Sequence, residues 1–258
     1  LIVWFFCWEL LDVNTLMQKN SQFKKFVEER WVPTIYLHCL YSHRNPSYYS
    51  SANNHLISEY AGLFVAASYW KFAESEEWLS HAKAGLEKEI INQHSENGIN
   101  KEEAAEYIQF ITDFFLIPLV VARATNNPFS DAYQNRLMKI MDYIYQMMDV
   151  RGSIPYYGDE DDGKVIVLEC GHPDNFKSLL TSGVVLFGNN QWKGKSVGWD
   201  TKNAVLFGKE GKQIFDNVNV SSANQPTKLY AKEGRFFLRK QQGEEEIYFD
   251  VFHFLSGL

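Results

Sequence analysis

The sequence predicts a mainly α-helical fold that ends in a short antiparallel β region. Apolar residues recur at helical steps over residues 1–150, and glycine and proline interrupt this pattern over residues 152–173. From about residue 216 the apolar residues alternate with a period of two, which is typical of strands. The chain has 258 residues, of which 45% are hydrophobic and 22% charged, so it can form one large globular domain or slightly more.

The helices are predicted in order along the chain. Residues 1–12 are expected to form a buried helix, because this apolar run has no basic leader and is shorter than the roughly 20 residues that a membrane span needs. Further helices are predicted around 51–67 and over 72–94, 101–124, 129–149 and about 174–188. Short connections favour antiparallel neighbours, which either wind into an α/α toroid or pack as a bundle.

The β region begins at about residue 216. Strands are predicted at Lys228–Ala231, Arg235–Arg239 and Glu246–Phe254, with a hairpin turn at Gln241–Glu244. About three strands with open edges make an incomplete sandwich. Together with the start at Leu1, this leads us to expect a fragment of a larger fold.

Charge and cysteine content limit the classes of function. The net charge is −7 and no long basic run occurs, so nucleic-acid binding is not expected. The global charge also disfavours an anionic polysaccharide, although local charge in a cleft decides that matter. The cysteines, Cys7, Cys39 and Cys170, lack metal-binding spacing and are predicted to be buried thiols.

Two segments carry the polar residues that are best suited to chemistry. The segment Ser51–Leu63 holds Asn54, His55 and Glu59, and the segment Asn97–Phe110 holds Tyr107; both are predicted to be helical. An amide and an imidazole can polarise a carboxylate, and a tyrosine can then move a proton. This combination suits cleavage of an acidic sugar chain by elimination.

Each of these residues also has a structural interpretation. Asn54 could cap a helix. His55 and Glu59 stand four residues apart, so they could form a surface pair or belong to a metal site, although no further ligands stand beside them. Tyr107 could be one more core aromatic residue, and as a base it would need a pKa below the ordinary value of about 10.

An acidic run, Asp159–Asp162, allows three interpretations. Paired carboxylates serve glycosidases, a cluster of oxygen ligands can bind Ca²⁺, and a solvated loop can carry such charges without further function. The first interpretation makes a glycoside hydrolase on an α/α toroid, using Asp159 or Asp161, an alternative function.

The polar segments occur within a wider resemblance to the heparinase II/III-like family of polysaccharide lyases. Its motifs are Ser51–Leu63, the Gly98-x-x-x-Glu-x-x-x-x-Tyr107 stretch, Gly158–Gly163 and Tyr248–Gly257. The resemblance implies a partial α/α toroid over residues 1–215 and the start of an antiparallel β-sandwich over 216–258. It also implies β-elimination at a uronic acid.

The resemblance assigns roles to the polar residues. Asn54 and His55 would neutralise the substrate carboxylate, Asn53 and Glu59 would support substrate binding, and Tyr107 would act as acid or base. A family histidine is expected beyond the strand that ends at about Gly257, so catalysis by this chain is expected to be impaired. A non-catalytic acidic-glycan-binding fragment is therefore a second alternative.

The resemblance also sets expectations about partners. It implies an acidic polysaccharide substrate, neither nucleic acid nor membrane as a partner, and a periplasmic or secreted location. No cofactor is certain, although a divalent metal in the β-domain is possible for the family.

Overall fold

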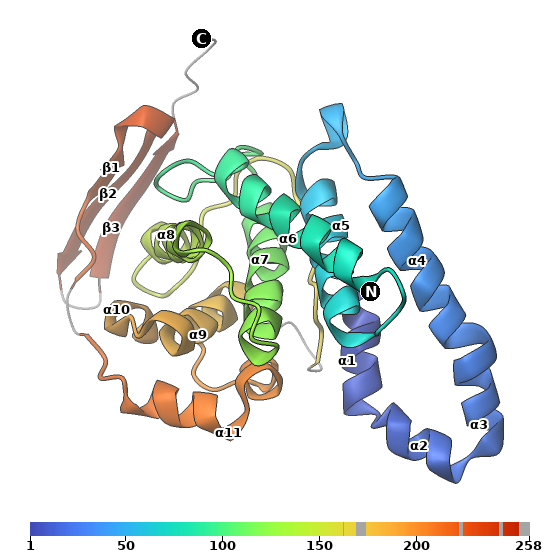
Figure 1. The fold of residues 1–258 in the computed structure, drawn as a ribbon. Coiled ribbons are helices and arrows are strands. Elements are labelled where there is room, and N and C mark those ends of the chain that lie inside the picture. Colours follow the sequence, from blue (N-terminus) through green and yellow to red (C-terminus); the bar gives the residue numbers. More distant parts are fainter. Residues whose placement is uncertain (162, 169–173, 222–223, 243–244, 253–258) are drawn as a thin grey trace. The chain divides into compact units, whose positions relative to one another are not determined.

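The computed structural model describes residues 1–161, 163–168, 174–221, 224–242 and 245–252 (Figure 1). Its elements are α1 (Ile2–Leu10), α2 (Val13–Lys19), α3 (Ser21–Phe26), the π-helical turn η1 (Val27–Trp31), α4 (Val32–Arg44), the 3₁₀ turn η2 (Tyr49–Ser51), α5 (Asn54–Tyr69), α6 (Ser75–Asn92), α7 (Tyr107–Ala124), α8 (Asp131–Met147), α9 (Asn175–Phe187), α10 (Asn190–Lys193), α11 (Thr201–Asn217), β1 (Lys228–Tyr230), the 3₁₀ turn η3 (Ala231–Glu233), β2 (Arg235–Gln242) and β3 (Glu245–Phe252). The prediction of a mainly helical chain followed by antiparallel strands is confirmed.

The chain divides into two compact units. The first comprises Leu1–Ile90 and Phe114–Ser130, and the second comprises Ile91–Asp113 and Asp131–Leu258. Helix α7 therefore contributes residues to both units. The predicted domain boundary between residues 215 and 216 stays a prediction.

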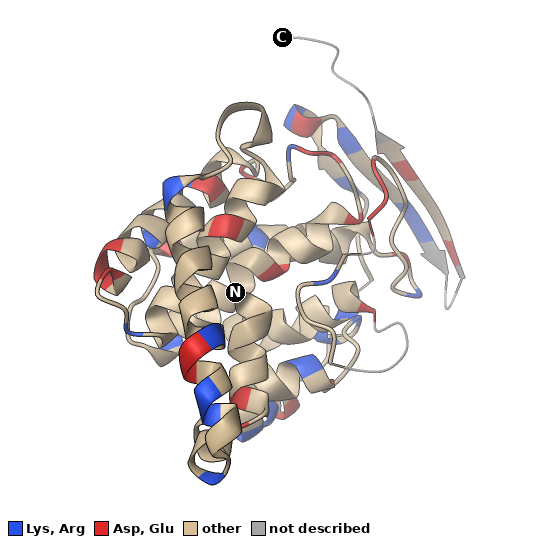
Figure 2. Cartoon of the chain, turned by 90° about the vertical axis from the view of Figure 1, so that its right-hand side faces the viewer, with Lys and Arg blue, Asp and Glu red and all other residues tan. Residues whose placement is uncertain are grey.

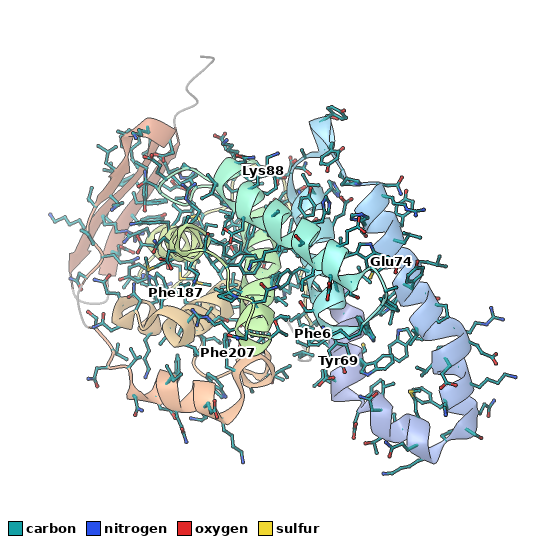
Figure 3. The ribbon with its side chains drawn as sticks, viewed as in Figure 1. Phe6, Tyr69, Glu74, Lys88, Phe187 and Phe207 are labelled. Atoms are coloured by element: carbon teal, nitrogen blue, oxygen red, sulfur yellow. The ribbon has the colours of Figure 1, made fainter. Side chains whose placement is uncertain are left out.

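Helix α5 forms the centre of the first unit. Ile57, Ala61 and Phe64 are fully buried, as are most residues between Leu63 and Ala67, so nearly the whole circumference of the helix is apolar. Gly85 of α6 admits the Tyr60 ring, because a Cβ at residue 85 would lie 2.5 Å from that ring. The end of α5 packs on α1, where the Phe5 and Tyr69 rings lie 5.1 Å apart. Figure 3 labels Tyr69 at this end of α5 and Phe6 on α1.

The helix predicted over residues 1–12 is confirmed as α1. Ile2, Phe6 and Trp8 are buried, whereas Val3 and Leu10 are more than half exposed, so only one face of the helix is covered. Among the predicted buried thiols, Cys39 is fully buried and burial raises the pKa of its thiol to about 12. Cys7 is only partly buried, because it lies on the less covered side of α1, and Cys170 lies outside the described residues.

The second unit combines α8, α9 and α11 with a three-stranded antiparallel sheet in the order β1-β2-β3. Phe237 of β2 is fully buried, stacks on Tyr248 of β3 and lies 5.9 Å from the Tyr143 ring of α8. The alternate residues Leu238 and Phe249 are exposed, as the period of two predicts. The ends of the predicted third strand and hairpin turn fall on residues outside those described.

The predicted start of one helix is wrong. Residues 101–106 were expected to be helical, but α7 begins only at Tyr107. Gly98 and Glu103 have left-handed φ angles of +82° and +54°, which an α-helix does not accommodate. In addition, the Ala105 amide donates to the Tyr157 carbonyl at 2.9 Å, so a contact far along the sequence holds this segment out of the helix.

Helix α11 had no counterpart among the predicted helices. Gly208 lies inside it with a non-helical backbone conformation, φ +58°, and kinks it. Within the described residues, α7 is the one helix long and apolar enough to cross a membrane, but 67% of that segment is buried inside the fold. Such burial is what the core helix of a globular unit requires.

Candidate functional site

The start of α5 holds the first group of predicted site residues. Asn53 is the N-cap, and its side-chain oxygen accepts a hydrogen bond from the His55 amide at 3.1 Å. Asn54 is the first helical residue and is partly buried, while the side chain of His55 is exposed. The N–H groups in the first turn of a helix carry partial positive charge, so this end of α5 favours an anion.

Glu59 lies one turn further along α5 and fixes the preceding loop. Its carboxylate accepts hydrogen bonds from the Ser47 amide at 2.8 Å and the Ser47 hydroxyl at 2.6 Å. These charge-assisted bonds tie the loop before η2 to the helix. The predicted support of His55 by Glu59 stays a prediction, since the recorded partner of this carboxylate is Ser47.

Two tyrosines beside this helix start were not predicted as site residues. Tyr49 is 95% exposed in a left-handed conformation with φ +62°, and Tyr48 is 47% exposed. Burial and a hydrogen bond with Tyr48 raise the pKa of Tyr60. The signal in the sequence was the Pro46-Ser-Tyr-Tyr run immediately before the polar segment, since a turn that presents two rings can stack on sugar.

Tyr107 is the first residue of α7 and belongs to the second unit, whereas Asn53, Asn54, His55 and Glu59 belong to the first. Its ring packs beside Phe110 at 5.1 Å and is partly buried. Burial raises the pKa of Tyr107, and the carboxylates of Asp159 and Asp161 raise it further. The phenol is therefore protonated at neutral pH and is better suited to donate a proton than to accept one.

The loop containing the acidic run is held against the segment that precedes α7. The Asp161 amide donates to the Glu106 carboxylate at 2.8 Å, and the Gly163 amide donates to the Asp161 carboxylate at 2.7 Å. Gly158, at φ +74°, passes so close to the Glu103 carbonyl that a Cβ would lie 2.4 Å from its oxygen. The fold brings Tyr107 and the acidic run together, although they lie about 50 residues apart in the sequence.

A neighbouring arginine positions this loop. The Arg235 guanidinium lies 3.8 Å from the centre of the ring of Tyr157, the residue that precedes Gly158. The same guanidinium pairs with the Asp250 carboxylate. A second buried pair joins Arg239 of β2 to Glu246 of β3 at 3.0 Å. The sheet therefore supports the acidic loop through a cation–π contact and two ion pairs between its strands. Elsewhere acidic and basic residues are interspersed along the chain (Figure 2).

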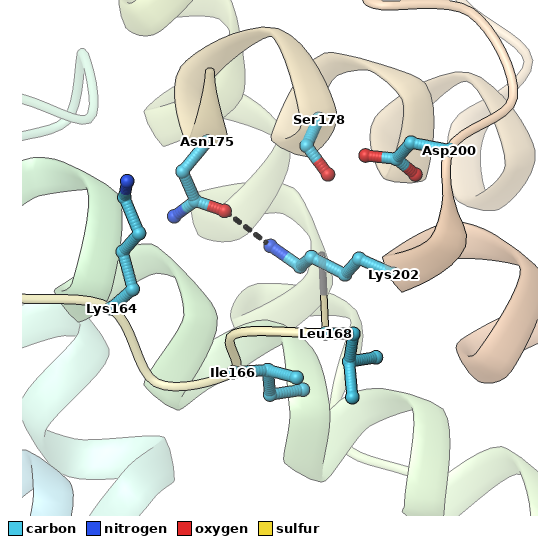
Figure 4. A pocket seen from close by; sticks show the side chains of 7 residues that line it. All are labelled: Lys164, Ile166, Leu168, Asn175, Ser178, Asp200 and Lys202. Carbon is cyan, nitrogen blue, oxygen red and sulfur yellow. Dashed lines mark hydrogen bonds between the residues drawn. The ribbon is translucent and has the colours of Figure 1, made fainter. Parts of the chain in front are cut away.

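A second polar group in this unit is buried around Lys202. Its ammonium donates to Asp113 at 2.6 Å. It also donates to Asn175 at 2.9 Å, the bond drawn in Figure 4. The adjoining cavity has a volume of about 20 Å³, which holds about one water molecule and no sugar. These contacts connect α7, α9 and α11, so we interpret the group as structural.

Metal ligation has no candidate group in the described part of the chain. Across residues 1–161, 163–168, 174–221, 224–242 and 245–252, no three or more histidine, cysteine, aspartate or glutamate side chains gather in a way that could hold an ion. In the acidic loop, the Asp161 carboxylate accepts from the Gly163 amide, and the Asp161 amide donates to the Glu106 carboxylate.

Solved structures with a similar fold include lyases. Heparinase III, the BT4657 gene product, is 17% identical with a TM-score of 0.62, over 95% of this chain and 36% of that one. Heparan sulfate lyase HepC from Pedobacter heparinus is 18% identical with a TM-score of 0.52, over 78% and 28% of the two chains. A further Heparinase III structure is 20% identical with a TM-score of 0.54, over 75% and 28%. Comparison with curated protein sequences finds no significant match.

At these identities the likeness shows the fold alone, and it confirms the predicted fold class of a partial α/α toroid followed by antiparallel strands. The second layer of a β-sandwich stays a prediction. The chain spans between 28% and 36% of the length of the three solved chains. The family model described as Heparinase II/III N-terminus matches residues 4–176, well over half of the sequence. The chain therefore belongs to the heparinase II/III family.

Proposed function

We propose that this chain is part of a polysaccharide lyase that cleaves a uronic-acid-containing glycan by β-elimination. The observation that carries the proposal is the Asn54–His55 pair in the first turn of α5, in a chain of the heparinase II/III family. An exposed imidazole and a partly buried amide at a helix start form a suitable receptor for a carboxylate.

A base takes the proton at C5 of the uronate, a role that the family histidine expected beyond about Gly257 would have, and the electrons of that C–H bond form a double bond between C4 and C5. The bond from C4 to the glycosidic oxygen breaks, and that oxygen takes up a proton. A charged carboxylate opposes loss of the C5 proton, so His55, Asn54 and the helix start would stabilise the developing negative charge.

Tyr107 fits the second proton transfer. The burial and the nearby carboxylates that raise the pKa of this phenol keep it protonated, so it can donate to the leaving oxygen. We propose a heparan-type glycan as substrate, because one of the similar solved structures is a heparan sulfate lyase. A periplasmic or secreted location follows from such an extracellular substrate.

The test is to incubate the chain with heparan sulfate and record ultraviolet absorbance. Elimination leaves a double bond conjugated to the carboxylate, so absorbance rises as the chain is cleaved. New reducing ends without this absorbance would show hydrolysis and would favour Asp159 or Asp161 as the catalytic carboxylates. Saturable binding with neither product would show that the chain is a glycan-binding fragment.

A further inference from the structure

A hollow in the first unit is lined by aromatic rings and one arginine. It has a volume of about 360 Å³, within the range of roughly 300–1,000 Å³ that ligand pockets occupy. Its lining residues come from α1, α3, η1 and α4 and are Trp4, Phe26, Arg30, Trp31 and Thr34. These residues have no part in the chemistry proposed for Asn54, His55 and Tyr107.

A proline explains the unusual backbone of one wall. Pro33 has no N–H to bond the carbonyl four residues earlier, and the chain responds with the π-helical turn Val27–Trp31. In this turn the Val32 amide donates to the Val27 carbonyl, five residues back. Because Val27 is fully buried, the turn is anchored to the core while Phe26 and Trp31 border the hollow.

The rings around the hollow are held by neighbouring rings. Trp31 lies 5.3 Å from Trp8 and 6.3 Å from Phe26, and Trp4 meets His38 edge-on at 5.0 Å. Phe26 is nevertheless 50% exposed, so an apolar surface remains available to a ligand. Rings that are already positioned lose little conformational entropy on binding.

Arg30 adds a positive charge that no acidic neighbour neutralises. The nearby acidic residues Glu28 and Glu29 pair instead with Lys24 at 3.7 Å and Lys25 at 4.0 Å. Throughout the described part of the chain, the Arg30 guanidinium has no hydrogen bond or ion pair. Its own carbonyl accepts a bond from the Thr34 hydroxyl at 2.7 Å, which steadies the backbone at this point.

We propose that this hollow, the Arg30 groove, binds one acidic sugar unit of the glycan at a distance from the reacting bond. The aromatic faces would stack on the C–H face of the sugar ring, and the guanidinium would pair with its carboxylate or sulfate. The choice of an acidic glycan rests on the proposed function.

The position of the groove makes it a separate subsite. It borders the start of α4, whereas the loop after the end of α4 leads into Asn53 and Asn54. Helix α4 has 13 residues, which correspond to about 20 Å along its axis. A glycan of several sugar units could therefore occupy the groove and the α5 start of one unit at the same time.

The experiment titrates the chain with short heparan sulfate oligosaccharides and follows tryptophan fluorescence. We expect saturable binding that Arg30→Gln weakens about tenfold, since a lost charge-assisted hydrogen bond has an effect of that size. Phe26→Ala should weaken binding as well. Lys88→Gln, which removes one exposed charge from α6, is the matched control and should bind like the parent.

Unchanged affinity in both Arg30→Gln and Phe26→Ala would overturn the groove proposal, whether or not the chain cleaves glycan. A change in oligomeric state caused by either variant would also overturn it, because the groove would then be a protein interface. Conversely, groove binding without any ultraviolet signal would support the groove and contradict the lyase reaction. The two proposals therefore fail separately.

Discussion

Helices α5 and α7 each begin with residues proposed to act on substrate, but their surroundings differ in charge. The start of α5 is capped by the neutral Asn53 and presents His55 to solvent. The start of α7 lies beside Asp159 and Asp161. Burial raises the pKa of Tyr107 most, and these two carboxylates raise it further. The first turn of α5 thus favours an anion, whereas the first turn of α7 favours a protonated tyrosine.

This difference suggests that the two helix starts serve different parts of the reaction. A carboxylate of the substrate would be received at the start of α5, where the helix dipole places partial positive charge. The proton would be donated where neighbouring carboxylates keep the phenol neutral. The following variants test each half of this comparison in order of expected effect.

Tyr107→Phe should have the largest effect. Removal of the hydroxyl removes the proposed proton donor, and loss of a general acid typically lowers the rate by about 10²–10⁴-fold. The measurement is the rate of ultraviolet absorbance increase on heparan sulfate. Tyr41→Phe, at a residue 69% exposed on α4, is the matched control and should retain full activity. Equal rates in both variants would contradict the role of Tyr107.

His55→Ala should have the next largest effect. The rate of elimination should be about 10²–10³-fold lower, as expected when one donor to a developing negative charge is lost. Because the His55 side chain is exposed, the midpoint of thermal unfolding should not change. A variant that loses stability and activity together would point to a structural role for the imidazole.

Asn53→Ala tests whether the N-cap of α5 contributes to the stability of the protein. The variant loses the side-chain acceptor for the His55 amide, and removal of such a cap costs about 1 kcal/mol. The measurement is the free energy of unfolding in urea, with Asn53→Asp as a control that keeps an acceptor oxygen. If both variants unfold alike, the cap does not contribute to stability.

Neutralising the acidic loop should have the smallest effect at neutral pH. The pKa of Tyr107 is raised in part by Asp159 and Asp161, so Asp159→Asn with Asp161→Asn should lower it toward its ordinary value. A phenol that acts as an acid is active below its pKa, and the rate falls as pH rises through that value. The alkaline limb of the pH–rate profile should therefore move to lower pH, and no movement would refute this coupling.

Much of the fold was predictable because it depends on local patterns. The apolar faces of α5, α6, α8 and α9 and the alternation in β2 and β3 can be recognised from neighbouring residues alone. The cap of α5 is Asn53, whereas the sequence offered Asn54 for that position, and the roles of the polar residues at this helix start stay predictions.

The sequence by itself determined the helical class and the terminal strands, because periodicity and residue type express local preferences. Only the tertiary structure decided that α7 starts at Tyr107, that the acidic loop raises the pKa of this tyrosine, and that Arg30 borders an aromatic groove. Each of these depends on contacts between distant residues, such as the bond from the Ala105 amide to Tyr157. Local propensity carries no information on such contacts, because packing and long-range hydrogen bonds override it.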